Sequence, residues 1–115
     1  LAVSRALGDF RWKEYVVSTP EVRTTELGSS DEGFILLACD GVFDVFTNEQ
    51  AVSIIQNSYR ERVQAAARSL GVQSLSVEQK SNVDMNIATV LAENLVERAI
   101  QEGSHDNITC LVCLC

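Results

Sequence analysis

The sequence predicts an α+β layered domain, in which strands joined by turns are covered by helices. Three observations lead to this fold class. Short apolar segments separated by turn-forming residues occupy the chain before residue 40, two later segments carry apolar residues at helical spacing, and an apolar run closes the chain. The 115 residues, of which 46% are hydrophobic and 22% charged, fit one globular domain or part of a larger one.

Three apolar segments in the first part of the chain are predicted to be strands. Residues 1–4 are largely apolar, and residues 21–27 carry Val and Leu among Thr and charged residues, as an edge strand does. Residues 34–39 are continuously apolar, too short for a helix, and preceded by a turn-forming segment at 28–33. This pattern is typical of a buried central strand.

The first helix is predicted to begin at Thr47. Thr47 and Gln50 have the three-residue spacing of a capping box. Val52, Ile55 and Tyr59 then recur at the spacing that places side chains on one helical face. We therefore expect an amphipathic helix in this part of the chain.

The region after this helix is predicted to be less regular. Residues 60–82 are polar and rich in Ser and Gln, which predicts an insertion or mobile connection, with a short helix at 62–70 as one alternative. A second helix is predicted to begin at Asp84, as its cap, and to end at Gly103. Its apolar stripe consists of Ile87, Val90, Leu91, Leu95 and Ala99. Residues 108–114 are predicted to form the last strand.

The charge of the chain argues against two classes of partner. There are 9 Lys and Arg residues against 16 Asp and Glu residues, which gives a formal net charge of −7. An acidic chain without a cluster of basic residues is poorly suited to neutralise nucleic-acid phosphates. No apolar run approaches the roughly 18–20 residues of a membrane-spanning helix. We therefore expect neither a nucleic acid nor a membrane among the partners.

The four cysteines are predicted to be reduced thiols. Cys110, Cys113 and Cys115 lie in or directly after the last predicted strand, where alternation places Cys110 and Cys113 on opposite faces. Cys39 ends the predicted central strand. Two disulfides and a zinc site are the alternatives. Reduced thiols indicate a reducing compartment, cytoplasmic or nuclear.

A carboxylate follows directly after the predicted central strand. Asp40 is costly to place at the end of a buried strand unless it is paired or bound to a cation. Gly41 beside it allows a sharp turn and a close approach to a ligand, and Asp44 follows within the same segment. The alternative is an ordinary β-turn with a solvated Asp.

A second carboxylate, Asp106, lies in the predicted loop that enters the last strand. If this loop meets the one at Asp40, the two carboxylates converge and repel each other without a cation. Carboxylate oxygens suit hard ions such as Mg²⁺ and Mn²⁺. The alternative is an Asx-turn between a helix and a strand. His105, the only histidine, is expected to have a surface role, and no cysteine has a basic neighbour that would favour a thiolate nucleophile.

Three segments together resemble the metal-dependent protein phosphatases, the type 2C serine/threonine phosphatases. Residues 1–10 read LAVSRALGDF, residues 37–45 read LACDGVFDV, and residues 103–109 read GSHDNIT. They occur in the family's order, with Phe43 at a position where the family often has Trp. The resemblance covers nearly the whole chain, and residues 60–82 are its least recognisable part.

The resemblance implies a fold larger than this chain. It is a layered sandwich of antiparallel β-sheets flanked by α-helices, a four-layer αββα domain. Residues 1–115 would form a single partial domain, the C-terminal portion of that catalytic domain. The missing N-terminal half of the same domain would supply a metal-bridging Asp and a phosphate-binding Arg.

The resemblance also implies a site and an activity. Asp40 and Asp106 would be metal ligands for Mg²⁺ or Mn²⁺, two ions per complete domain. The accessory residues around them would be Asp44, Asn107, which orients Asp106, and Gly41. The complete domain would hydrolyse phosphoserine and phosphothreonine in a phosphoprotein substrate through a metal-activated water, and the chain alone is expected to be inactive. A catalytically dead domain that acts as a protein-binding or regulatory module is the alternative, and an unrelated α+β domain with acidic turns is another.

Overall fold

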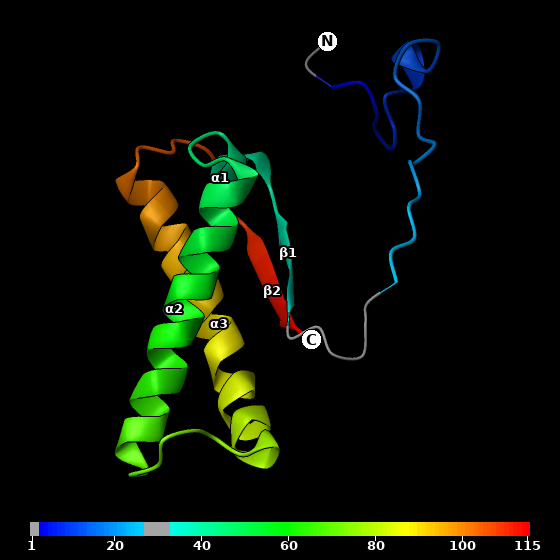
Figure 1. Cartoon of the computed structure of the whole chain (residues 1–115). Helices are drawn as coiled ribbons and strands as arrows, with labels where there is room; N and C mark the ends of the chain where they lie inside the picture. The colour runs from blue at the N-terminus through cyan, green and yellow to red at the C-terminus, as the bar shows by residue number, and fades with distance from the viewer. Residues whose placement is uncertain (1–2, 27–32) are drawn as a thin grey trace. The chain divides into compact units, whose positions relative to one another are not determined.

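The computed structural model describes residues 3–26 and 33–115, except for the side chains of residues 77 and 80–86. The chain divides into two compact units, Leu1–Ser30 and Asp31–Cys115. The first unit contains the 3-10 helix η1 (Phe10–Trp12). The elements of the second unit (Figure 1) are β1 (Phe34–Ala38), α1 (Asp40–Phe43), α2 (Asn48–Ser69), α3 (Val77–Gln101) and β2 (Cys110–Leu114).

The first unit is held by turns and local hydrogen bonds. The Lys13 Nζ donates to the carbonyl of Ala6 at 2.6 Å, and an isolated parallel bridge joins Arg5 to Val17. The strand predicted at residues 1–4 is wrong over residues 3 and 4, which form no strand. Its first two residues lie outside the described part of the chain.

The edge strand predicted at residues 21–27 is wrong over residues 21–26, which have no regular structure. A strand is stabilised by a ladder of hydrogen bonds to a neighbour, and the sheet of the described residues pairs β1 with β2. Residue 27 and residues 28–32 of the predicted turn lie outside the described residues.

β1 and β2 confirm two of the predicted strands. They pair antiparallel, in a register that runs from Phe34 opposite Leu114 to Ala38 opposite Cys110. The C-terminal end of β1 therefore lies beside the N-terminal end of β2. The chain segments that follow β1 and precede β2 are brought to the same end of the sheet.

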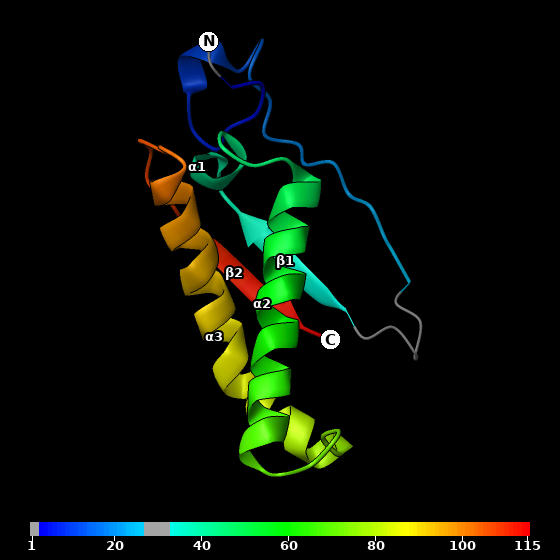
Figure 2. The same cartoon turned by 60° about the vertical axis from the view of Figure 1, so that its left-hand side comes forward.

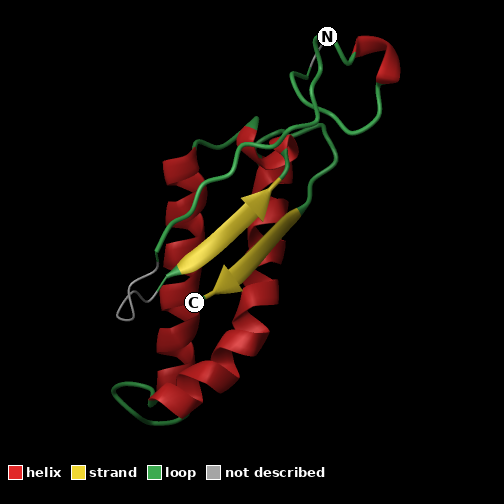
Figure 3. Cartoon of the chain, turned by 90° about the vertical axis from the view of Figure 1, so that its right-hand side faces the viewer, coloured by secondary structure: helices red, strands yellow, loops and turns green. Residues whose placement is uncertain are grey.

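One face of this sheet is exposed. Ile35 and Leu37 are 44% and 61% exposed, whereas Leu36 between them packs against the core. Helices α2 and α3 lie on the same face of the sheet (Figure 3). The prediction that residues 34–39 form a buried central strand is therefore wrong, because in the described part of the chain β1 pairs with β2 alone and has one covered face.

α2 begins where the sequence predicts. Gln50 Oε1 accepts from the Thr47 backbone N–H at 2.8 Å, and Thr47 Oγ1 accepts from the Gln50 N–H at 3.2 Å, which completes a capping box. On the predicted apolar face, Ile55 is fully buried and Tyr59 half-buried, whereas Val52 is 39% exposed.

Residues 60–82 are mostly helical. The alternative of a helix at 62–70 is confirmed over 62–69, whereas the irregular structure predicted over 77–82 is wrong. α2 continues to Ser69, and α3 begins after Ser76, which forms a second capping box, rather than at Asp84. The two long helices run antiparallel (Figure 2). Packing against α3 explains why α2 is longer than predicted. One face of α2 is wholly or partly buried along its length, at Ile55, Tyr59, Val63 and Ala67. α3 ends as predicted, with Gly103 after it at a φ of +89°.

The core of the second unit lies between the helices and the inner face of the sheet. Most of the predicted α3 stripe is buried there, namely Ile87, Leu91, Leu95 and Ala99, with Val90 half-buried. Val112 of β2 and Val42 of α1 belong to the same cluster, together with Phe46, Ala51 and Ile55. The α+β fold class with antiparallel strands and flanking helices is confirmed. No helix among the described residues is both long enough and apolar enough to cross a membrane.

Candidate functional site

The two segments that carry the predicted carboxylates, helix α1 with Asp40 at its start and the loop with Asp106, meet at one end of the sheet. Cys39 and α1 follow β1 directly, and the loop at residues 102–109 leads from α3 into β2. Both views of the ribbon place α1 beside that loop (Figures 1 and 2). The condition set by the sequence analysis, that the segments at Asp40 and Asp106 meet at the same end of the sheet, is therefore fulfilled by the backbone.

Cys39 joins the two loops by three hydrogen bonds. Its backbone N–H donates to the carbonyl of Thr109 at 3.0 Å, which extends the β1–β2 ladder by one step. Its thiol donates to the carbonyl of Asn107 at 3.1 Å, and its sulfur accepts from the Thr109 N–H at 3.2 Å. One half-buried side chain thus bonds two backbone groups of the opposite loop.

Gly41 lies where the two loops approach most closely. It is buried, and a Cβ on this residue would overlap the carbonyl oxygen of Asn107 and stand 3.2 Å from Cγ1 of Ile108. The Ser104 hydroxyl donates to the carbonyl of Gly41 at 2.6 Å. Only glycine therefore leaves room at this position for the loop before β2. The accessory role of Gly41 at a metal site stays a prediction.

The carboxylates of Asp40 and Asp106 are both exposed. Asp40 Oδ1 accepts from the Gly41 N–H at 3.1 Å, and Asp106 Oδ1 accepts from the Asn107 N–H at 2.6 Å. Asp44 is exposed as well, at the C-terminal end of α1, where its N–H donates to the carbonyl of Asp40 at 2.7 Å. The metal-ligand and accessory roles of these residues stay predictions.

The donor set fits a hard divalent cation in part. Exposed carboxylate oxygens are the ligands that Mg²⁺ and Mn²⁺ prefer. Within the described part of the chain, however, no group of three or more His, Cys, Asp or Glu side chains is arranged to hold a metal ion. Asp40 and Asp106 would therefore supply only some of the ligands of a complete site.

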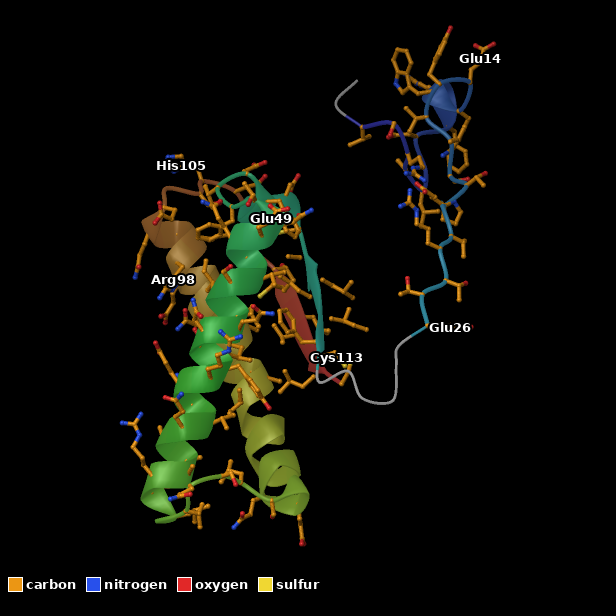
Figure 4. All side chains as sticks on the ribbon, viewed as in Figure 1. Glu14, Glu26, Glu49, Arg98, His105 and Cys113 are labelled. Carbon is orange, nitrogen blue, oxygen red and sulfur yellow. The ribbon has the colours of Figure 1, made fainter. Side chains whose placement is uncertain are left out.

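The histidine and the cysteines of the described residues form no nucleophile–base pair. His105 is exposed in the loop between α3 and β2 (Figure 4). All four cysteines are free, as predicted. Burial, and to a smaller extent the charge of Cys39, raises the pKa of the Cys110 thiol, which keeps it protonated and makes it a poor nucleophile.

A groove of about 370 Å³ is lined by residues of α2, by Phe46 before it and by Arg98 of α3. Its charged lining residues are Glu49, Glu61 and Arg98, two of which are labelled in Figure 4. The groove contains none of the predicted site residues, so it adds nothing to the candidate metal site.

The sequence reasoning missed the two side chains that connect the loops. The sequence analysis predicts a reduced thiol for Cys39 at the end of the central strand and no role for Ser104. A signal for both exists in the sequence, because each lies within two residues of a predicted metal ligand. Polar side chains in such positions often orient the ligands beside them.

Comparison with known proteins shows which proteins the chain resembles. The family profile described as "Protein phosphatase 2C" matches residues 1–108. The chain is 40% identical over 112 residues to "Probable protein phosphatase 2C 59" of Oryza sativa subsp. japonica, covering 97% of this chain and 26% of that protein. It is 39% identical over 114 residues to the human "Integrin-linked kinase-associated serine/threonine phosphatase 2C", again covering 97% of this chain and 26% of that protein.

A solved structure shares the fold. The structure of "a C.elegans sex determining protein" matches with a TM-score of 0.63 and 27% sequence identity, covering 99% of this chain and 22% of that chain. The chain thus spans about a quarter of the length of the curated relatives it matches.

Proposed function

The chain belongs to the protein phosphatase 2C family, and we propose that it forms part of a catalytic domain that hydrolyses phosphoserine and phosphothreonine in proteins. The observation that carries the proposal is the meeting of two carboxylate-bearing loops at one end of the sheet, linked through Cys39, Gly41 and Ser104. Neither loop would be informative alone. Together they place two acidic residues on adjacent, fixed backbone.

In this proposal Asp40 and Asp106 supply oxygen ligands for Mg²⁺ or Mn²⁺, with two ions per complete domain. Bound divalent cations supply an activated water and positive charge against the phosphoryl oxygens. Asn107 orients Asp106 through its backbone N–H, and Asp44 serves as an accessory acidic group. The substrate is a phosphoprotein, and the remaining ligands come from a segment of the relatives that this chain does not span. The free thiols support a cytoplasmic or nuclear location.

The proposal is tested by Asp40→Asn and Asp106→Asn in a complete phosphatase domain that carries this chain. Asn keeps the shape of Asp but loses the negative charge that holds a cation. We expect kcat on a phosphopeptide at saturating Mn²⁺ to fall by about a hundredfold or more for each variant. The metal-free thermal transition should not fall, because removing one of two neighbouring carboxylates relieves repulsion.

His105→Ala is the matched control, because His105 lies in the same loop as Asp106 and is exposed like it. We expect its kcat to change far less. A loss as large as that of Asp106→Asn would make the histidine a catalytic acid and overturn the role assignment. Near-full activity of Asp40→Asn would reject the cation site at this strand end. A wild-type complete domain that folds, binds no Mn²⁺ and hydrolyses no phosphopeptide would favour the alternative of a protein-binding module.

A further inference from the structure

The loop that carries Asp106 is fixed largely by a side chain of the opposite segment. The β1–β2 ladder proper ends at the pair of Ala38 and Cys110, and the Cys39 N–H extends it by one bond to Thr109. On the N-terminal side of Thr109, the chain leads back to the end of α3. The backbone groups that flank Asp106 on its β2 side therefore need partners from elsewhere.

The Cys39 thiol supplies these partners. It donates to the carbonyl of Asn107, the residue after Asp106, and its sulfur accepts from the N–H of Thr109. Cys39 is itself the residue before Asp40. A single side chain therefore spans from the backbone next to one predicted ligand to the backbone next to the other, although the bonded residues are 68 and 70 positions apart in the sequence.

We propose that Cys39 is a positioning residue, whose thiol sets the spacing of Asp40 and Asp106 by tying their neighbouring backbone groups together. The inference rests on the proposed function, because the spacing matters only if the two carboxylates share bound cations. Thiol hydrogen bonds are weak individually, so the expected contribution is to the geometry of the loops and only slightly to overall stability.

A second link leaves the fold in place when the thiol is removed. The Ser104 hydroxyl holds the carbonyl of Gly41 at 2.6 Å, and the backbone bond from Cys39 to Thr109 does not involve the side chain. A Cys39 variant should therefore keep the loop attached while loosening the segment around Asp106. This separates positioning from folding.

Cys110 provides a matched control. It is also a half-buried free thiol, but its Sγ donates to the carbonyl of Ala92 in α3 at 3.3 Å and not to the loop that carries Asp106. Removing this thiol costs a comparable hydrogen bond and comparable volume. It should disturb stability without disturbing the spacing of Asp40 and Asp106.

The experiment compares Cys39→Ala, Cys39→Ser and Cys110→Ala in a complete phosphatase domain that carries this chain. Mn²⁺ binding is measured by isothermal titration without substrate, and exchange of the Thr109 amide hydrogen is measured in the metal-free protein. Cys39→Ala should weaken Mn²⁺ binding by about tenfold and accelerate exchange at Thr109. Cys39→Ser should restore most of both, because a hydroxyl donates and accepts as the thiol does. Cys110→Ala should lower the thermal midpoint and leave Mn²⁺ affinity unchanged.

Several results would overturn the proposal. The proposal fails if Cys39→Ala binds Mn²⁺ as tightly as wild type. It also fails if Cys110→Ala loses as much Mn²⁺ affinity as Cys39→Ala, or if Cys39→Ser regains none of the lost affinity. If Cys39→Ala does not fold, Cys39→Val repeats the test with more of the volume kept, and failure of both to fold makes the thiol a structural group. A wild-type domain that binds no Mn²⁺ would defeat the proposed function instead. In that case the amide hydrogen exchange of Thr109 still tests the role of the thiol. Equal exchange rates in wild type and Cys39→Ala would show that the thiol does not order the loop.

Discussion

Gly41 is the residue whose size decides how closely the two loops pack. It lies within α1, a position where alanine is normally favoured over glycine by up to about 1 kcal/mol. Here the space that a Cβ would need is occupied by the carbonyl of Asn107. That carbonyl also accepts the Cys39 thiol, so it cannot move away without breaking this bond.

We predict that Gly41→Ala destabilises the protein despite its better helix propensity. Forcing a methyl group into this contact should lower the free energy of unfolding by about 1–3 kcal/mol. Urea denaturation of a complete domain measures the change. Gly33→Ala is the control, because a Cβ at Gly33 meets nothing within 4 Å. Equal denaturation midpoints for the two variants would show that the loop before β2 adapts freely.

At the scale of elements, the residue that caps α2 also affects the pKa of a nearby carboxylate: Thr47 forms the capping box and contributes to the lowered pKa of Glu49. The pKa of Glu49 is lowered chiefly by a hydrogen bond from its own backbone N–H and further by the Thr47 side chain. A lowered pKa means that the folded protein favours the ionised form. The associated stabilisation is present above the ordinary pKa of 4.5 and is lost as the pH falls through the lowered value.

We predict that Thr47→Ala weakens the cap and moves the pKa of Glu49 part of the way back toward 4.5. Only part of the shift should be lost, because the backbone hydrogen bond of Glu49 remains. The free energy of unfolding at neutral pH should fall by about 1 kcal/mol. An NMR titration of Glu49 and urea denaturation measure the two effects. Ser76→Ala, which removes the cap of α3, should lower stability similarly and leave the Glu49 pKa where it is; a pKa that moves in both variants would contradict this cause.

The two capping boxes also show what sequence reasoning reaches and what it misses. The box at Thr47 and Gln50 is visible because an apolar period follows it directly. The box at Ser76 and Gln79 has the same spacing but is followed by polar residues, so the apolar period predicts a helix start at Asp84 instead. Helix propensity alone does not determine where α3 begins. Contact between two long helices stabilises polar helical segments that would be marginal alone.

For the candidate site, more can be predicted from the sequence about the backbone than about the side-chain contacts. The apolar segments predict the strands β1 and β2, but the antiparallel pairing that brings Asp40 and Asp106 to one end of the sheet is seen only in the structure. The thiol and hydroxyl contacts of Cys39 and Ser104 depend on the path of the loop before β2. No periodicity encodes that path. The ligand roles of the two carboxylates stay predictions.

At the scale of the whole molecule, the outer face of the sheet is incomplete by itself. Leu37 and Leu111 form a cross-strand pair on this face and are 61% and 55% exposed. Ile35, opposite Cys113, is 44% exposed beside them. An apolar sheet face of this kind is normally covered by a second sheet about 10 Å away. This is the place that the sandwich fold of the resemblance assigns to the other sheet.

We predict that the isolated 115-residue chain self-associates and hydrolyses no phosphopeptide, because its apolar face and strand edges are uncovered and its cation ligands are incomplete. Sedimentation velocity measures the association. Leu37→Lys together with Leu111→Lys should make the isolated chain more monomeric, whereas the same pair should destabilise a complete domain. A monomeric wild-type chain with metal-dependent hydrolysis of its own would refute the prediction.

The pairing of β1 with β2 bears on the order in which the second unit folds. Cys39 and Thr109 are 70 residues apart in the chain, and closing so long a loop costs entropy before any contact forms. α2 and α3, each with its own capping box, are joined by a short connection, so the helical hairpin can form from nearby contacts. We therefore expect the sheet to close last. Partial unfolding would then separate Asp40 from Asp106 while both helices persist.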